Sequence, residues 1–175
     1  MPIHPLFPLS IKNSKAKIIL TPCPGTKEAD LITSLNEIKA VGVEAVLTFM
    51  TQTELDKNNL SDIGKSVKAK GMSWFHLPII DDEAPEDPFL ESWKTAGPAV
   101  HRLIEQGKTI AVHCKGGSGR TGLVSAQILL ERGEEIEPLM KRIKRLRPNA
   151  FMHACHRDYL LNLNKQLLSN TNYSK

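Results

Sequence analysis

The sequence predicts an α/β fold with a largely parallel central sheet of about four to five strands and helices on both faces. Short apolar, β-branched segments alternate with longer segments whose apolar residues recur at helical spacing. Such alternation is typical of a parallel sheet that is covered on both sides. The composition supports a globular protein, since 41% of the 175 residues are hydrophobic and 24% are charged. This length suits a single domain with a sizeable core.

Strands are predicted where short apolar runs end at turn-forming residues. The run from Ile18 to Leu20, for example, is halted by two prolines and Gly25. Strands are expected over residues 18–20, 43–50, 72–77 and 109–112.

Helices are predicted from apolar side chains three and four positions apart, together with residues that start or stop helices. Thr51 and Glu54 form the pattern of a capping box, and Pro148 ends the helix before it. Helices are expected over residues 27–41, 60–70, 89–106, 123–130, 136–146 and 153–168, with a short one after Thr51. Residues 1–17 are expected to form a proline-bearing arm, 18–168 a single domain and 169–175 a polar tail.

The most informative segment is VHCKGGSGRTG, which runs from Val112 to Gly122. Cys114 ends an apolar run, and Arg120 lies just before a helical pattern. Glycines let backbone N–H groups converge on one point, and a helix N-terminus adds further N–H groups and a positive dipole end. The segment therefore predicts an anion-binding loop between a strand and a helix.

This loop combines a phosphate site with a nucleophile. The planar guanidinium of Arg120 matches two phosphate oxygens at once. The same positive field favours the thiolate form of Cys114, which is the nucleophilic form of cysteine. The segment therefore places a nucleophilic sulfur at the entrance of a phosphate site.

Composition and charge narrow the expected partners and compartment. A net charge of +4 suits an acidic substrate, but no basic cluster argues for nucleic acid. Three widely spaced cysteines argue against a disulfide framework and favour the cytoplasm. The proline-containing N-terminus does not have the pattern of a signal peptide, and no apolar run approaches the roughly 18 residues of a membrane span. The histidines have no metal-ligand spacing, so neither metal nor cofactor is expected, and a monomer is the expected state.

The run from His113 to Gly122 resembles the phosphate-binding loop of cysteine-dependent protein phosphatases, in the form HCxxGxGRTG. The resemblance implies a metal-independent enzyme that hydrolyses phosphotyrosine, and also phosphoserine or phosphothreonine, in a phosphorylated protein through a phosphocysteine. It makes Cys114 the nucleophile, assigns Thr121 a hydrogen bond to the departing sulfur, and gives His113 the role of ordering the loop. The implied phosphate-binding residues are Lys115, Gly116, Gly117, Ser118, Gly119 and Arg120.

A proton donor for the leaving oxygen is expected on the acidic loop over residues 80–88, because general acid catalysis needs a side chain within reach. The sequence PIIDDEAP, from Pro78 to Pro85, resembles the general-acid loop of dual-specificity phosphatases and implies that Asp81 is the acid. Asp82 is the alternative. The resemblance covers residues 18–159 and is closest to the cyclin-dependent kinase inhibitor 3-like (kinase-associated) branch and its bacterial relatives. It implies the three-layer α/β/α fold of protein tyrosine phosphatases.

The chain departs from that branch at His153 and His156, where relatives often carry Thr and Gln, so the resemblance does not fix the hydrolytic step. Lys115 is compatible with acidic or phosphoinositide substrates and equally with a solvated position. Cys23 is expected to be a small buried residue, with a protective disulfide to oxidised Cys114 as the alternative. The basic run over 141–147 is expected to be a solvated helix face, with contact to an acidic partner as the alternative. The alternative functions are the same chemistry on a non-protein ester such as a phosphoinositide, and a phosphate-binding module without turnover.

Overall fold

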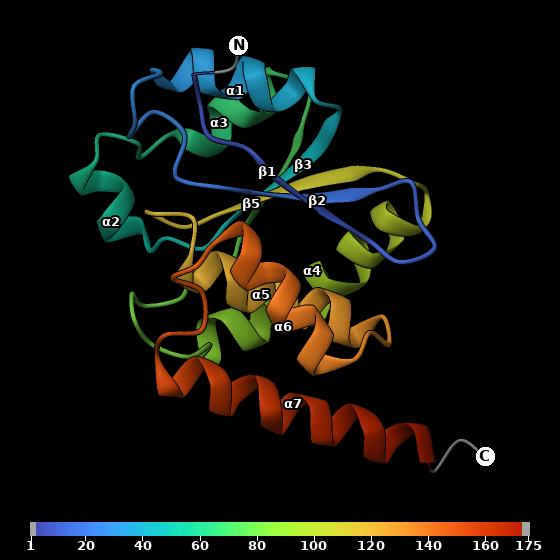
Figure 1. The fold of residues 1–175 in the computed structure, drawn as a ribbon. Coiled ribbons are helices and arrows are strands. Elements are labelled where there is room, and N and C mark those ends of the chain that lie inside the picture. Colours follow the sequence, from blue (N-terminus) through green and yellow to red (C-terminus); the bar gives the residue numbers. More distant parts are fainter. Residues whose placement is uncertain (1–2, 173–175) are drawn as a thin grey trace.

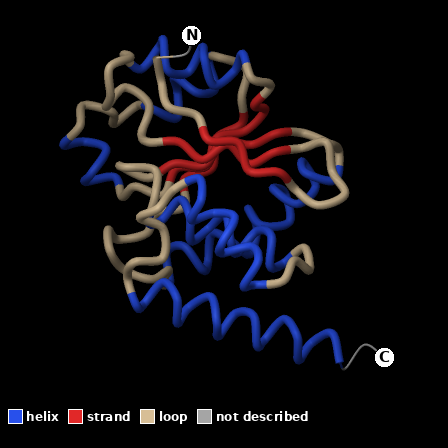
Figure 2. Tube along the Cα trace, in the orientation of Figure 1, coloured by secondary structure: helices blue, strands red, loops and turns tan. Residues whose placement is uncertain are grey.

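The structure is a computed structural model that describes residues 3–172. A five-stranded sheet in the order β1-β2-β5-β3-β4 lies at its centre (Figures 1 and 2). β1 pairs antiparallel with β2, and the other neighbours pair in parallel. The predicted α/β sheet is therefore confirmed. The strands are β1 (Phe7–Ser10), β2 (Lys17–Thr21), β3 (Val43–Thr48), β4 (Ser73–His76) and β5 (Thr109–His113).

Helices cover both faces of the sheet, as predicted (Figure 1). One face carries α1 (Leu31–Ala40) and α3 (Ile63–Ala69), and the short α2 (Gln52–Lys57) follows the end of β3. The other face carries α4 (Asp87–Glu105), α5 (Gly119–Glu131) and α6 (Ile136–Leu146). α7 (Ala154–Asn172) packs against the outer side of α5. Two buried apolar clusters, one on each face, complete the three layers.

Local capping explains where the helices begin. Asp30 accepts a hydrogen bond from the N–H of Thr33 at 2.7 Å, so α1 begins after Asp30 rather than at residue 27 as the apolar spacing predicts. The capping box of α2 is present, because Thr51 Oγ1 accepts from Glu54 N and Glu54 Oε2 accepts from Thr51 N. The capping box predicted for Thr51 and Glu54 is therefore confirmed.

The N-terminal arm contains a strand that the sequence did not indicate. β1 lies at the edge of the sheet, where Pro8 is tolerated because one side of an edge strand makes no ladder hydrogen bonds. The arm before β1 is tied to the domain by Glu37, whose carboxylate accepts from the backbone N–H groups of Ile3 (2.9 Å) and His4 (2.7 Å). Residues 1–2 of the predicted arm lie outside the described residues.

The predicted polar tail is helical in its first part. α7 continues through Asn172, and residues 173–175 of the tail lie outside the described part of the chain. Among residues 3–172, no helix has both the length and the apolar character that crossing a membrane requires.

The parallel strands end in one row, which places their following loops together. Thr21 of β2 and Thr48 of β3 both align with His113 of β5, and His76 of β4 aligns with Thr48. Loops that leave the carboxyl ends of neighbouring parallel strands form the usual binding crevice of α/β folds. The predicted nucleophile, Cys114, directly follows this row.

Candidate active site

The predicted anion loop joins β5 to α5 and depends on Gly117. This glycine has φ of +76°, in the left-handed region that favours glycine. A Cβ built on Gly117 would lie 2.5 Å from the backbone nitrogen of Pro22, so the loop packs directly on the backbone that follows β2. The close approach fixes where the loop turns over the end of the sheet.

Cys114 lies at the start of this loop and is 4% exposed. The hydroxyl of Thr121, from the first turn of α5, donates to Cys114 Sγ at 3.1 Å. Thr121 itself is fully buried, so the hydroxyl is held in place. A hydroxyl donor at this distance stabilises negative charge on sulfur.

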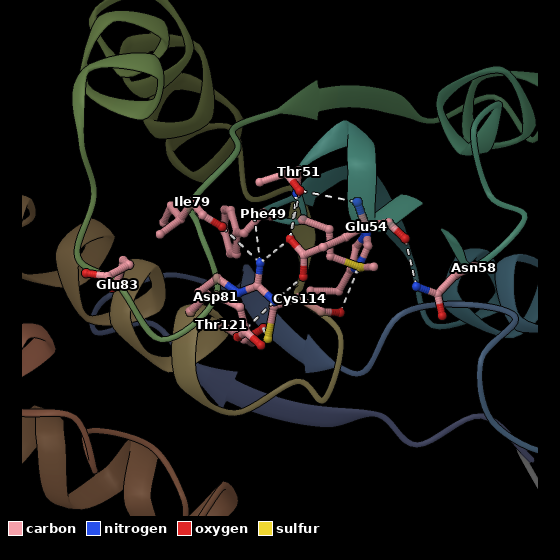
Figure 3. Close-up of polar contacts among 12 residues, drawn as sticks. Phe49, Thr51, Glu54, Asn58, Ile79, Asp81, Glu83, Cys114 and Thr121 are labelled. Carbon is pink, nitrogen blue, oxygen red and sulfur yellow. Dashed lines mark hydrogen bonds and ion pairs between the residues drawn. The ribbon is translucent and has the colours of Figure 1, made fainter. Parts of the chain in front are cut away.

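The guanidinium of Arg120 is 1% exposed and is held from several sides (Figure 3). Nη1 donates to the carbonyl oxygen of Ile79 at 2.9 Å and to that of Phe49 at 3.4 Å. Both Nη atoms donate to the carboxylate of Glu54, each at 2.8 Å. The buried Nε is the guanidinium nitrogen that has no hydrogen-bond partner within residues 3–172. A buried N–H without an acceptor is costly, and an oxyanion in the adjoining cavity is a suitable acceptor.

Glu54 is a site residue that the sequence analysis assigned only to the capping box of α2. Burial raises the pKa of Glu54, but hydrogen bonds from Arg120 and from the N–H of Thr51 outweigh burial and hold the pKa below its ordinary range. The same carboxylate therefore starts α2 and anchors Arg120. Its capping pattern gave no signal of the second role, since Arg120 lies 66 positions away.

The two candidate acids point to different partners. Asp81 Oδ1 lies 3.1 Å from Arg120 Nη2, with the side chain 65% exposed. Asp82 has φ of +65°, and its Oδ1 lies 2.9 Å from His153 Nε2. Figure 3 shows Asp81 near Cys114 and Thr121, while Glu83 lies apart on the loop. Of the two aspartates, Asp81 is therefore the one directed toward the arginine.

His113 links the strand row to the loop. Its Nδ1 lies 3.2 Å from the carbonyl oxygen of Cys114, so this nitrogen carries the proton, since a carbonyl only accepts. Nε2 then accepts from the hydroxyl of Thr48 at 2.7 Å, and Thr48 in turn accepts from Trp74 Nε1 at 2.9 Å. Burial lowers the pKa of His113 from 6.5 to about 4. A neutral histidine therefore bonds both to the loop and to the neighbouring strand.

Cys114 and Arg120 line one cavity of about 440 Å³. Asp81 and Asp82 of the acidic loop lie on its wall, as do residues from the start of α7. The lining residues are Asp81, Asp82, Cys114, Lys115, Gly116, Ser118, Gly119, Arg120, Asn149, Met152, His153 and His156. Most of the predicted site residues therefore converge on this cavity, while His113, Gly117 and Thr121 support it from behind.

Residues 24–134 match a protein-family model described as "Polymorphic toxin system, DSP-PTPase phosphatase". The chain belongs to this family. The predicted membership of the dual-specificity phosphatase superfamily is thereby confirmed.

Named relatives of this DSP-PTPase phosphatase agree with the family. Cyclin-dependent kinase inhibitor 3 of Rattus norvegicus is 30% identical over 136 residues, which cover 75% of this chain and 63% of the rat protein. The chain thus spans under two thirds of that relative's length. A crystal structure of kinase associated phosphatase, with its catalytic site cysteine substituted by serine, has a TM-score of 0.84 at 24% identity, covering 96% of this chain and 97% of the other. A structure of PTPMT1 in complex with PI(5)P has a TM-score of 0.70 at 17% identity, covering 90% and 95%. These two structures are similar in fold.

Other segments of the chain hold the anion loop through two of its carbonyl oxygens. Lys115 O accepts from Cys23 N at 3.1 Å, and Gly116 O accepts from Arg147 Nη2 at 2.9 Å. Arg147 Nε also donates to Ser118 Oγ at 3.0 Å, and its guanidinium lies 4.4 Å from the ring centroid of Phe7. The expectation of a solvated basic face is therefore wrong for Arg147, because the C-terminal end of α6 approaches the loop. No local pattern in the sequence indicates this contact.

Cys23 lies near the loop and Lys115 within it, but neither side chain packs with Cys114. Cys23 is fully buried among the apolar residues on the α1 and α3 face, whereas Cys114 belongs to the opposite cluster. Burial raises the pKa of Cys23 to about 12. This arrangement favours the packing role over the disulfide. Lys115 Nζ donates to Asn58 Oδ1 at 2.5 Å, so its side chain is directed to the end of α2.

Proposed function

We propose that the chain hydrolyses phosphotyrosine, and with it phosphoserine or phosphothreonine, in proteins through a phosphocysteine at Cys114. The observation that carries the proposal is the pairing of a buried sulfur, which accepts from Thr121, with a buried Arg120 N–H that lacks a protein acceptor, both at one cavity. Sulfur supplies the nucleophile, and the free donor supplies a place for a phosphate oxygen.

The loop amides are the second part of the phosphate site. The carbonyl oxygens of Lys115, Gly116 and Ser118 are bonded to Cys23, Arg147 and Gly122 respectively. Because the N–H of a peptide unit points opposite to its carbonyl, this arrangement supports an inward direction of the neighbouring N–H groups. These donors and Arg120 stabilise the charge on the transferring phosphoryl group without a metal ion.

The reaction has two steps. The Cys114 sulfur bonds to phosphorus as the ester P–O bond breaks, and the carboxyl of Asp81 transfers its proton to the leaving oxygen. A water oxygen then bonds to phosphorus as the P–S bond breaks, and the Asp81 carboxylate accepts the proton of that water. General acid assistance of this kind contributes about 10²–10⁴ in rate. The position of Asp81 beside Arg120 supports this role for Asp81 over Asp82.

A phosphorylated protein is the favoured substrate class, since the kinase-associated relatives are named for protein kinases. PTPMT1 in complex with PI(5)P favours a phosphoinositide as the second candidate. The bond between Lys115 and Asn58 weighs against a lipid headgroup, because it engages the lysine of the loop.

The test is hydrolysis of p-nitrophenyl phosphate in the presence of EDTA, with Cys114→Ser and Asp81→Asn as variants. We expect turnover by the parent chain, none by Cys114→Ser, and unchanged phosphate binding by Cys114→Ser. A panel of phosphotyrosyl peptide, phosphothreonyl peptide and PI(5)P then assigns the class. Faster release of phosphate from PI(5)P than from either peptide would overturn the protein-directed proposal. Turnover by Cys114→Ser would overturn the mechanism.

A further inference from the structure

Three side chains at the start of α7 contact the acidic loop, and none of them takes part in the reaction proposed above. His153 Nε2 lies 2.9 Å from Asp82 Oδ1, the thiol of Cys155 donates to Asp82 O at 3.2 Å, and His156 Nε2 lies 2.8 Å from Glu83 O. We call His153, Cys155 and His156 the α7 clasp. All three contacts fall on the two residues that directly follow Asp81.

The acidic loop is anchored on either side of its tip by the buried Ile79 and Pro85, and the exposed tip between them makes few other contacts. It turns through a hydrogen bond from Glu83 N to Ile80 O at 3.0 Å, and Asp82 takes the left-handed backbone conformation. A residue other than glycine in that region is disfavoured, although aspartate tolerates it better than most. Ile80 is 58% exposed, so the tip of the turn itself is not held by apolar burial. External contacts therefore decide whether Asp81 stays at Arg120.

His156 is the buried member of the clasp and reaches both sides of the site. Its side chain is 1% exposed, and Nε2 carries the proton because Glu83 O only accepts. Nδ1 is buried without a hydrogen-bond partner among the residues described. The ring also lies against α5, since a Cβ built on Gly119 would be 3.6 Å from His156 Cε1. His156 thus bridges the acidic loop and the end of the anion loop.

His153 is the more exposed histidine of the clasp and contacts Asp82 at the surface. Its ring packs edge-on against His156, with centroids 5.3 Å apart. Its partner Asp82 is the aspartate that turns away from Arg120. The pairing draws Asp82 outward, and because Asp81 precedes it in the chain, the same turn directs Asp81 inward.

We propose that His153 and His156 are positioning residues that keep Asp81 over Cys114 for general acid catalysis. The inference rests on the proposed function, and it names the device that orders the acid. Holding the loop in advance removes the entropic cost of ordering it during each reaction. Without the clasp, the phosphate site remains and proton delivery weakens.

The test compares esters that differ only in their need for a proton. Phenyl phosphate has a poor leaving group, whereas 2,4-dinitrophenyl phosphate leaves without protonation. We expect the double variant His153→Ala/His156→Ala to lower kcat/KM for phenyl phosphate by about 30- to 100-fold, within the range of general acid catalysis. For the dinitrophenyl ester we expect a change of less than about threefold, and inhibition by inorganic phosphate should be unchanged.

Further variants separate positioning from structure. His153→Gln and His156→Gln keep an N–H donor toward Asp82 and Glu83, and we expect them to retain most of the rate with phenyl phosphate. Asp81→Asn should cost less rate in the double variant than in the parent chain, since both changes act on the same step. Asp158→Ala, an exposed position of α7, is the matched control and should match the parent chain. His153→Ala alone keeps the buried His156 and serves if the double variant does not fold.

Equal losses on both esters would overturn the inference, because the clasp would then act through the fold or the phosphate site. An unchanged rate with phenyl phosphate would overturn it as well. Failure of the proposed function has a different signature, since Cys114→Ser would then still hydrolyse both esters.

Discussion

Replacement of Glu54 by glutamine tests whether Arg120 depends on its carboxylate anchor. The pair joins an arginine that is 1% exposed to a glutamate side chain that is 25% exposed, through two bonds of 2.8 Å. Breaking a fully buried ion pair costs about 3–5 kcal/mol. Because Glu54 is partly solvated and glutamine still accepts one hydrogen bond, we expect Glu54→Gln to lower the free energy of unfolding by about 2–3 kcal/mol.

The same change should slow the reaction. If the less firmly held guanidinium stabilises the transition state by about 2 kcal/mol less, kcat/KM falls by about 30-fold. Urea unfolding and kinetics with p-nitrophenyl phosphate measure the two effects on the same preparation. Glutamine preserves the capping box of α2, so helix loss does not contribute.

Thr51→Ala is the control for this experiment. It removes the side-chain cap of α2, at a cost of about 1 kcal/mol, while the bonds between Glu54 and Arg120 can remain. We expect its kcat/KM to stay within about threefold of the parent, since the guanidinium keeps its anchor. Equal losses of kcat/KM in Glu54→Gln and Thr51→Ala would refute the reasoning, because α2 and not the ion pair would then control activity.

Three further predictions concern the loop and its support. Gly117→Ala places a Cβ at a left-handed φ and 2.5 Å from the backbone of Pro22, so it should lower the free energy of unfolding by at least about 2 kcal/mol. Gly116→Ala is the control, because no atom lies within 4 Å of its added Cβ, and it should change that free energy by less than about 1 kcal/mol. Similar melting temperatures for the two variants would contradict this prediction. The pKa of His113 is lowered from 6.5 to about 4, so between these pH values the unfolded chain binds a proton at His113 that the folded chain does not bind. The contribution of His113 to the free energy of unfolding is therefore fully present above pH 6.5, and about 3 kcal/mol is lost as the pH falls to 4. His113→Asn should flatten that part of the pH dependence of unfolding, and an unchanged slope would argue that the ring is protonated or exposed. Thr121→Val removes the donor to Cys114 Sγ and should lower kcat about tenfold, while Thr121→Ser keeps it; equal rates for both variants would exclude a role of the hydroxyl.

Local sequence patterns were sufficient for most of the sheet and for the loop that carries the nucleophile. The strands before Thr21 and His113, the capping box at Thr51 and the glycine-rich turn at Gly117 each depend on residues within a few positions. Apolar spacing, capping and turn chemistry operate over this range, so they are visible in the sequence. The resemblance favoured Asp81 and kept Asp82 as the alternative, because only the turn around Asp82, which the sequence does not show, separates the two carboxylates.

The contacts that hold the site depend on distant segments. Glu54 lies 66 positions from Arg120, Arg147 lies 31 from Gly116, and His156 lies 73 from Glu83. In each case the residue has an ordinary local role, as a cap, a basic helix residue or a helix start, and the second role arises from packing. The strand β1 was missed for the same reason, because an edge strand with a proline owes its pairing to the neighbouring β2.

Trapping of the covalent intermediate tests the central claim most directly. Asp81→Asn slows hydrolysis of the intermediate, so rapid acid quenching during turnover of p-nitrophenyl phosphate should give a chain that carries one phosphoryl group. Peptide mass spectrometry should locate that group on the sulfur of Cys114, and Cys114→Ser should give no labelled sulfur. A phosphoryl group on any other side chain, or turnover with no labelled Cys114 at any quench time, would contradict the account.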